Sequence, residues 1–101
     1  MTLFRRHSVL SAAAREALAE ALRAPTFELV PLKNALAQAA FLPPAATVSV
    51  TASPAKGIEA TVALCEQLQA AGFRAVPHLA ARMIRDRAHL RDIVTWLEGV
   101  G

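Results

Sequence analysis

Residues 47–77 read TVSVTASPAKGIEATVALCEQLQAAGFRAVP, and their pattern is enough to predict an α/β unit. Residues 47–51 alternate hydroxyl-bearing and valine side chains with a period of two, which predicts a β-strand whose valines face the covering helices and whose hydroxyls point the other way. Over residues 57–71 apolar side chains recur at helical spacing, and Gly72 follows where a helix commonly ends in a residue with positive φ. A second strand is predicted over residues 73–77. Strand, helix and strand at this spacing indicate parallel strands joined by a crossover helix.

The same alternation extends to both sides of this stretch. Residues 26–30 form another strand-like run, and a short helix-like run over residues 32–40 follows, which Pro43 and Pro44 cannot continue. A last helix is expected to begin near Asp86, a residue type that caps helix N-termini well. The apolar stripes of the two long helices are expected to contain Ile58, Val62, Cys65 and Leu68 in the first, and Leu90, Ile93, Val94 and Leu97 in the second.

Three strand–helix units with parallel strands imply an α/β fold. A TIM (β/α)8 barrel needs eight such units, and three strands leave two parallel edges unpaired. Residues 25–101 are therefore expected to be a partial TIM barrel, the first three βα units of a larger α/β protein. The alternative is a small open α/β domain with three strands.

Residues 1–24 precede this unit as a separate segment. Their arginines and serines resemble those of a transit peptide, but such peptides are poor in acids, and this segment contains Glu16 and Glu20. We expect instead an N-terminal helical extension with Ser11 as its N-cap, which stops at Pro25.

Composition sets outer limits on function. The chain has 101 residues, of which 54% are hydrophobic and 19% charged, so it is one domain at most and not a disordered polyelectrolyte. The net charge of +3 comes from interspersed charges of both signs, and no apolar run is long enough to span a bilayer, so no nucleic-acid or membrane partner is expected. A single cysteine, Cys65, excludes an internal disulfide and fits a reducing compartment, the cytoplasm.

Glu28 is the first candidate for chemistry. In the predicted strand it shares a face with Thr26 and Val30, opposite to the apolar side chains that suit the helix layer. This places a carboxyl inside the barrel with no cationic neighbour in sequence, where a carboxyl tends to keep its proton and can act as a general acid. The alternatives are a glutamate bonded to hydroxyls at the strand ends, or an exposed glutamate on an edge strand.

His78 is the second candidate, because it ends the third strand and parallel α/β folds bind ligands at the carboxyl ends of their strands. A neutral imidazole there can donate to or accept from a cofactor ring. The alternative is a histidine satisfied within its own loop. His89 is expected to face solvent, and Cys65, His78 and His89 lack the spacing of a metal site, so no metal is expected.

Two further features are weaker signals. The small residues at 52–57, with Gly57 at the helix entry, leave backbone N–H groups free to meet an anion or a ring edge, although the glycine pattern of a phosphate-binding loop is missing. Four arginines near the last helix are expected to form a solvated, partly ion-paired face, or to hold a phosphate or a polyglutamate tail: Arg82, Arg85, Arg87 and Arg91.

Three short segments together resemble the methylenetetrahydrofolate reductase family. They are FELVP at residues 27–31, VSVT at residues 48–51 and VPHL at residues 76–79, and their order and spacing are similar to those of the first three strands of that family's barrel. The resemblance extends from Thr26 to the C-terminus. It implies a TIM barrel that reduces 5,10-methylenetetrahydrofolate to 5-methyltetrahydrofolate, normally by passing hydride from NADH or NADPH through FAD.

The resemblance also implies roles for individual residues. Glu28 matches the general acid that protonates a folate ring nitrogen and so opens the five-membered ring. Thr51 and Ala52 match positions that touch flavin and nicotinamide, and His78 matches a flavin contact. The family usually has an aromatic residue and then a glycine after the strand-two threonine, where Ala52 and Ser53 stand here.

The implied partners and the alternatives follow from these matches. The substrate is a small-molecule folate, and the implied cofactors are FAD with NADH or NADPH, or NAD(P)H alone in a direct transfer without flavin. The alternative functions are a catalytically inactive truncated barrel fragment and a small basic α/β binding module.

Overall fold

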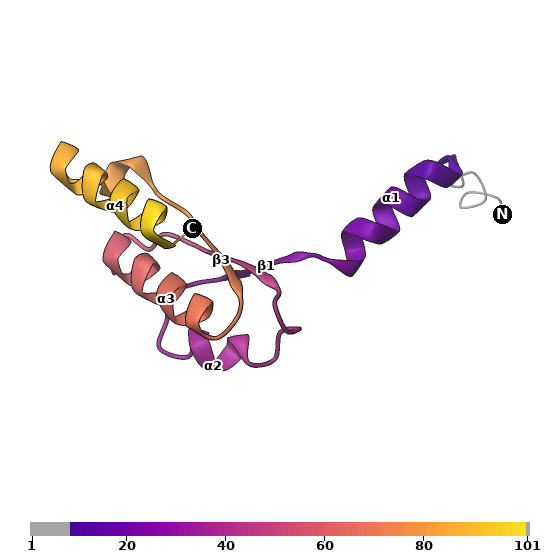
Figure 1. Cartoon of the computed structure of the whole chain (residues 1–101), viewed down its shortest axis with the longest axis horizontal. Coiled ribbons are helices and arrows are strands. Elements are labelled where there is room, and N and C mark those ends of the chain that lie inside the picture. The colour runs from indigo at the N-terminus through magenta and orange to yellow at the C-terminus, as the bar shows by residue number, and fades with distance from the viewer. Residues whose placement is uncertain (1–8, 101) are drawn as a thin grey trace.

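The computed structural model describes residues 9–100 (Figure 1). The elements are α1 (Ala12–Arg23), β1 (Thr26–Leu29), α2 (Ala35–Ala39), β2 (Thr47–Val50), α3 (Ile58–Ala70), β3 (Arg74–Pro77), a 3₁₀ helix η2 (Ala81–Met83) and α4 (Arg87–Val100). This order confirms the predicted alternation of strands and helices. The first part of the N-terminal segment, with Arg5, Arg6 and His7, lies outside the described residues.

The three strands form one parallel sheet in the order β1-β2-β3, which confirms a small α/β fold with parallel strands. The sheet is open, with β1 and β3 at its two edges among the described residues. Its register aligns the strands in four rows: Thr26, Thr47 and Arg74; Phe27, Val48 and Ala75; Glu28, Ser49 and Val76; Leu29, Val50 and Pro77.

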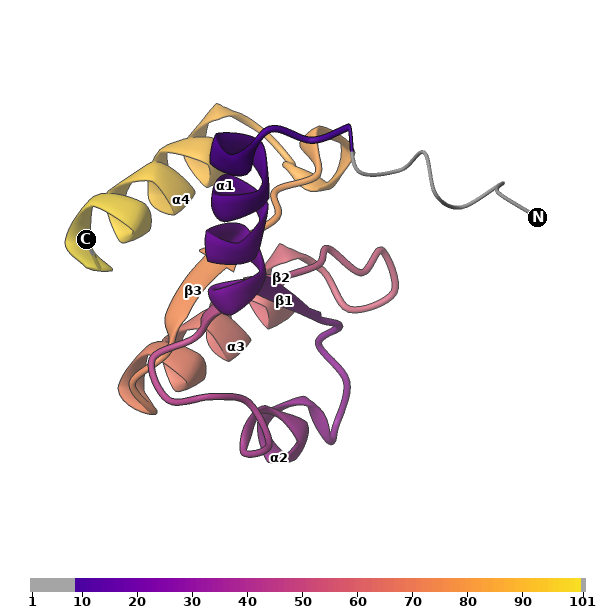
Figure 2. The same ribbon diagram turned by 90° about the vertical axis from the view of Figure 1, so that its right-hand side faces the viewer.

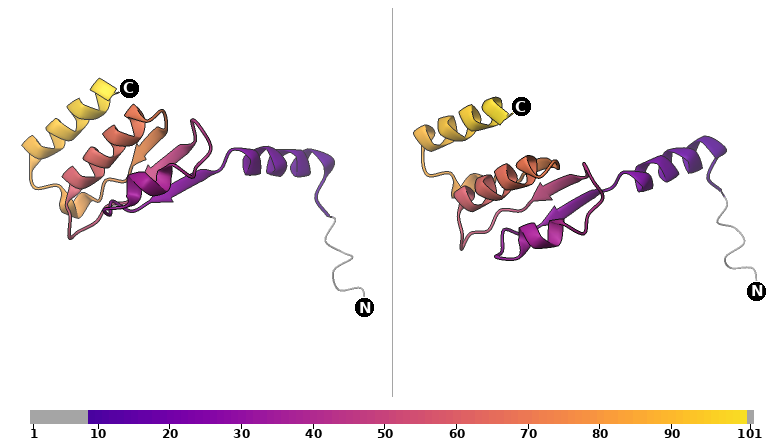
Figure 3. Two further views of the ribbon diagram at one scale, coloured as in Figure 1. Left: turned by 90° about the horizontal axis from the view of Figure 1, so that it is seen from below. Right: turned by 60° about the horizontal axis from the view of Figure 1, so that its bottom comes forward.

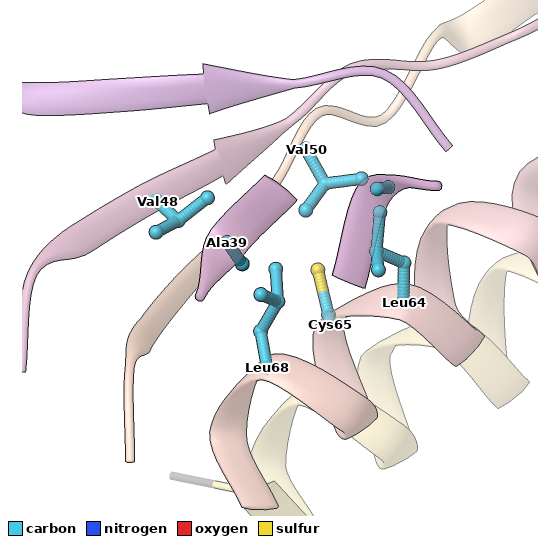
Figure 4. Packing of buried hydrophobic residues seen from close by; sticks show 7 residues of the cluster. Ala39, Val48, Val50, Leu64, Cys65 and Leu68 are labelled. Carbon is cyan, nitrogen blue, oxygen red and sulfur yellow. The ribbon is translucent and has the colours of Figure 1, made fainter. Parts of the chain in front are cut away.

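Helices α2 and α3 pack on one face of this sheet. Val48 and Val50 point from β2 into the core and are fully buried against Leu64, Cys65 and Leu68 of α3 (Figure 4). The prediction that the two valines face the helices, while the hydroxyls between them point the other way, is therefore confirmed.

The glycines at the two ends of α3 allow its sharp entry and exit. Gly57 precedes the helix with φ +85°, and Gly72 follows it with φ +94°, a backbone conformation that side chains disfavour. The buried stripe of α3 differs from the predicted one, because Thr61 and Leu64 are buried and Val62 is only half-buried. Thr61 tolerates burial because its hydroxyl donates to the carbonyl of Thr51 at 3.1 Å.

Helix α4 lies beside α3, and the two run in the same direction (Figure 3). Its predicted apolar stripe is partly wrong, since Leu90 and Val94 are 43% and 44% exposed and the buried residues are His89 and Ile93. The periodicity locates the apolar side of a helix, but the neighbour that covers it determines which part of that side is buried. Here α3 is that neighbour, and it meets α4 along the edge of the predicted stripe.

Helix α1 projects away from the sheet (Figure 1) and therefore stands in front of it when the molecule is seen from that side (Figure 2). It has no buried residue. Its predicted N-cap is confirmed, because the Ser11 hydroxyl oxygen accepts a hydrogen bond from the Ala14 N–H at 3.1 Å. The helix ends at Arg23, just before the predicted stop at Pro25. Helix α2 is shorter than predicted, since residues 32–34 form a turn in front of it.

We expect Leu68→Ala to be strongly destabilising, because Leu68 is fully buried between α3 and the sheet. Truncating such a leucine costs about 2–5 kcal/mol of unfolding free energy. Leu22→Ala is the matched control, since Leu22 lies on α1 and is 70% exposed. Urea unfolding followed by circular dichroism measures both, and equal effects of the two substitutions would show that the core lies elsewhere.

Candidate functional site

The sheet face opposite α2 and α3 carries the residues that the sequence singled out. We call this the open face. It carries Thr26, Glu28, Thr47, Ser49, Thr51 and His78, together with Arg74 and Val76 of β3. The ladder continues one residue beyond β2 and β3, because the N–H of Thr51 donates to Leu29 and that of His78 donates to Val50, both at 2.9 Å. Thr51 and His78 therefore lie side by side at the carboxyl end of the sheet, where parallel α/β proteins bind ligands.

Glu28 and His78 meet on this face from the two outer strands. Glu28 Oε1 lies 3.9 Å from His78 Nδ1, and the two side chains are 59% and 51% exposed. The expectation of a buried carboxyl is therefore wrong, and the group nearest to it in charge terms is an imidazole, which is a cation only when protonated. Glu28 stands on an edge strand, and its exposure shows that this side of β1 is open to water, while its long side chain reaches across β2 to the imidazole.

Ser49 and Thr51 form the floor between these two side chains. Ser49 is buried, and its hydroxyl donates to the carbonyl of Phe27 at 3.5 Å, at the long end of hydrogen-bond distance. The main chain of Thr51 is held on both sides, by the bond to Leu29 and by the Thr61 hydroxyl. Ala52 follows, half-buried, as the first residue of the loop toward α3.

This arrangement combines an acid–base pair with fixed hydroxyls. An imidazole close to a carboxyl can exchange a proton with it directly or through one water molecule. The ring nitrogens and the hydroxyl of Thr51 can also donate to and accept from a heterocycle laid on the face. Among residues 9–100, no group of three or more His, Cys, Asp and Glu side chains is placed to hold a metal ion.

His89 takes part in a second polar cluster, which the sequence did not reveal. It is buried rather than solvent-facing, its Nδ1 accepts from the Arg85 N–H at 3.0 Å, and its Nε2 lies 3.2 Å from Glu59 Oε1. Arg85 Nη1 also contacts Glu59 Oε1, at 2.8 Å. The hydrogen bond from Arg85, the backbone hydrogen bond of Glu59 itself and the nearby charges hold the pKa of the Glu59 carboxyl below its usual value.

This cluster fastens the start of α4 to α3. Asp86 Oδ1 accepts from the His89 N–H at 2.8 Å, which confirms the predicted N-cap. The ion pair of Arg85 with Glu59 agrees with the expected, partly paired arginine face. Because His89 lies three positions after the N-cap Asp86, the sequence could have placed it in the first turn of α4. No residue pattern near His89 indicates that α3 covers this turn.

Two comparisons with known proteins, and a search of residues 9–100 for membrane-spanning helices, were negative. None of the helices in residues 9–100 has the length and apolar character needed to cross a membrane. No protein-family model matches the sequence, and no solved structure matches it significantly.

Proposed function

We propose that this chain is the N-terminal portion of a TIM-barrel oxidoreductase that reduces 5,10-methylenetetrahydrofolate to 5-methyltetrahydrofolate with NADH or NADPH, normally through FAD. Glu28 is its general acid, and Thr51, Ala52 and His78 form one wall of the cofactor site. One observation supports the proposal most. Glu28 Oε1 and His78 Nδ1, on the first and third strands, lie 3.9 Å apart on the open face, at the carboxyl end of a parallel sheet.

The donor set of the open face fits one edge of a flavin or nicotinamide ring. His78 and Thr51 supply a ring nitrogen and a hydroxyl at the same level of the sheet, and the half-buried Ala52 follows Thr51 directly. When bound, the cofactor supplies the hydride. The residues of this chain orient the ring edge and handle the proton.

Glu28 carries the acid step in this proposal. A folate ring laid on the open face removes water from the Glu28 carboxyl and so favours its protonated form. The carboxyl then donates to the ring nitrogen, and the His78 imidazole, 3.9 Å away, passes it a replacement proton that the imidazole takes up from water. The exposure of both side chains favours one alternative, a barrel fragment that is catalytically inactive until further strands cover this face.

Weak ligand binding tests the proposal on the chain itself. We expect FAD and tetrahydrofolate, added separately to ¹⁵N-labelled protein, to shift the backbone amide signals of Glu28, Thr51, Ala52 and His78. One wall of a site supplies little affinity, so the dissociation constants are expected near 1 mM, about −4 kcal/mol. Val94 on the outer side of α4 is the internal control and should not shift.

Two variants separate the ligands. Glu28→Gln is expected to weaken the shifts caused by tetrahydrofolate more than those caused by FAD, and His78→Ala should do the reverse. Shifts that avoid the open face, or none at millimolar ligand, would refute the proposed site.

A further inference from the structure

Within the described residues 9–100, the outer edge of β3 has unpaired main-chain groups. The N–H groups of Arg74 and His78 point toward β2, where they bond to Ala46 and Val50 at 3.0 and 2.9 Å. Alternate residues of a strand bond to opposite sides, so the N–H and C=O of Ala75 point outward. The carbonyl of Phe73 points the same way, and Pro77 adds a carbonyl but no N–H.

A groove runs along this edge. Its volume is about 510 Å³, and its lining includes all of β3 together with Trp96, Leu97 and Val100 of α4. Unpaired main chain therefore lies beside an apolar wall. This combination fits an added extended strand whose alternate side chains are apolar on the helix side.

The outer edge of β1, at the opposite side of the same sheet, has the properties that such an added strand needs. On β1 the main chain of Leu29 is turned to β2, since its carbonyl accepts from Thr51, so the N–H and C=O groups of Thr26 and Glu28 point outward. The side chains of Phe27 and Leu29 lie on the helix side and are only half-buried. As far as residues 9–100 show, β1 is thus a strand with free outer donors and an apolar helix-side face.

We propose that β1 of a second copy of this chain adds to β3 as a parallel strand, with the second copy's Phe27 opposite Ala75. This register continues the rows already present within one chain, in which Phe27, Val48 and Ala75 are aligned. The second copy's Phe27 and Leu29 then enter the groove beside Leu97. In the closed barrel of the folate-reductase proposal further strands would pair with both of these edges, so the present proposal concerns the 101-residue chain by itself and does not depend on the open face.

The register satisfies the free groups of both edges. The N–H of Ala75 donates to the second copy's Thr26 carbonyl, and the N–H of the second copy's Glu28 donates to the Ala75 carbonyl. The carbonyl of Phe73 accepts from the N–H of the second copy's Thr26. The missing donor of Pro77 falls at the end of the contact, where it costs one hydrogen bond only.

Charge also favours this contact. Arg74 lies on the same side of the sheet as Glu28, and the added strand brings the second copy's Glu28 diagonally next to it. Long side chains on diagonal positions of neighbouring strands are within reach of each other. No ion pair involving Arg74 is present within residues 9–100 of a single chain.

The contact joins two different edges, so each copy keeps one edge free for the next. The assembly therefore grows into a ring or an open chain and does not stop at a two-fold dimer. We expect sedimentation velocity of the full chain to show a weight-average mass that rises with concentration above the 10.7 kDa of one copy.

A matched pair of variants on α4 tests the groove. Leu97→Lys places a charge in the groove and is expected to weaken association at least tenfold, whereas Val94→Lys, on the exposed side of the same helix, should leave it unchanged. Circular dichroism verifies that both variants are folded.

A charge exchange tests the register. Arg74→Glu and Glu28→Arg should each weaken association, and the double variant should restore it. A wild-type chain that stays at the mass of one copy at every concentration overturns the proposal, and so does association that Leu97→Lys leaves unchanged.

Discussion

NADH oxidation by the isolated 101-residue chain, mixed with FAD and methylenetetrahydrofolate, is expected not to exceed the rate without protein. In a (β/α)8 barrel the catalytic groups come from the ends of several strands around the whole ring, and this sheet has three strands. The exposure of Glu28 and His78, 59% and 51% for their side chains, shows that water reaches both. Hydride transfer needs donor and acceptor held about 3–3.5 Å apart in the right orientation, which contributes roughly 7–11 kcal/mol to catalysis.

The assay is run over the concentration range in which the chain is expected to associate. Buffer without protein and the denatured chain serve as the two controls for uncatalysed oxidation of NADH. Turnover comparable to that of a closed barrel would contradict the expectation, and a rate that rises with assembly would show that several copies together enclose the site.

Glu28→Gln, made in a catalytically active polypeptide that contains this sequence, is expected to lower turnover of methylenetetrahydrofolate by about 10²–10⁴-fold. The amide has the size of the carboxyl but cannot give up a proton to the folate ring nitrogen. Reduction of flavin by NADH should be almost unchanged, because that half-reaction needs no proton on the folate. Stopped-flow absorbance measures the two half-reactions separately.

Glu59→Gln is the matched control for this experiment. Glu59 is another exposed glutamate, but its contacts are to Arg85 and His89, away from the open face. It should leave both half-reactions intact. Equal loss of both half-reactions in Glu28→Gln would instead assign Glu28 a structural role.

The predictions that succeeded depend on short-range chemistry. The alternation of valines and hydroxyl-bearing residues over 47–51 determines which side chains of β2 share a face and which of the two faces is apolar. This assignment does not depend on residues elsewhere in the chain. The caps at Ser11 and Asp86 and the positive φ of Gly72 are equally local, since each follows from one side chain and its next few neighbours.

The predictions that failed depend on what covers a residue. The alternation in β1 correctly predicts the sheet face on which Glu28 lies. It does not determine whether another segment covers that face, and the prediction that the Glu28 side chain is buried is wrong. His89 shows the opposite error, because α3 happens to cover that side of α4. The approach of Glu28 to His78 needs the order β1-β2-β3, and periodicity alone does not fix that order.

The buried thiol in the core has a practical consequence for work on this chain. Cys65 is its only cysteine, and burial raises the pKa of the thiol to about 11. The thiolate is the form that reacts with maleimides and iodoacetamide, and at neutral pH it is scarce here as well as shielded by α3 and the sheet. A cysteine introduced on the surface can therefore carry a fluorophore or spin label at a single site without prior removal of the native one.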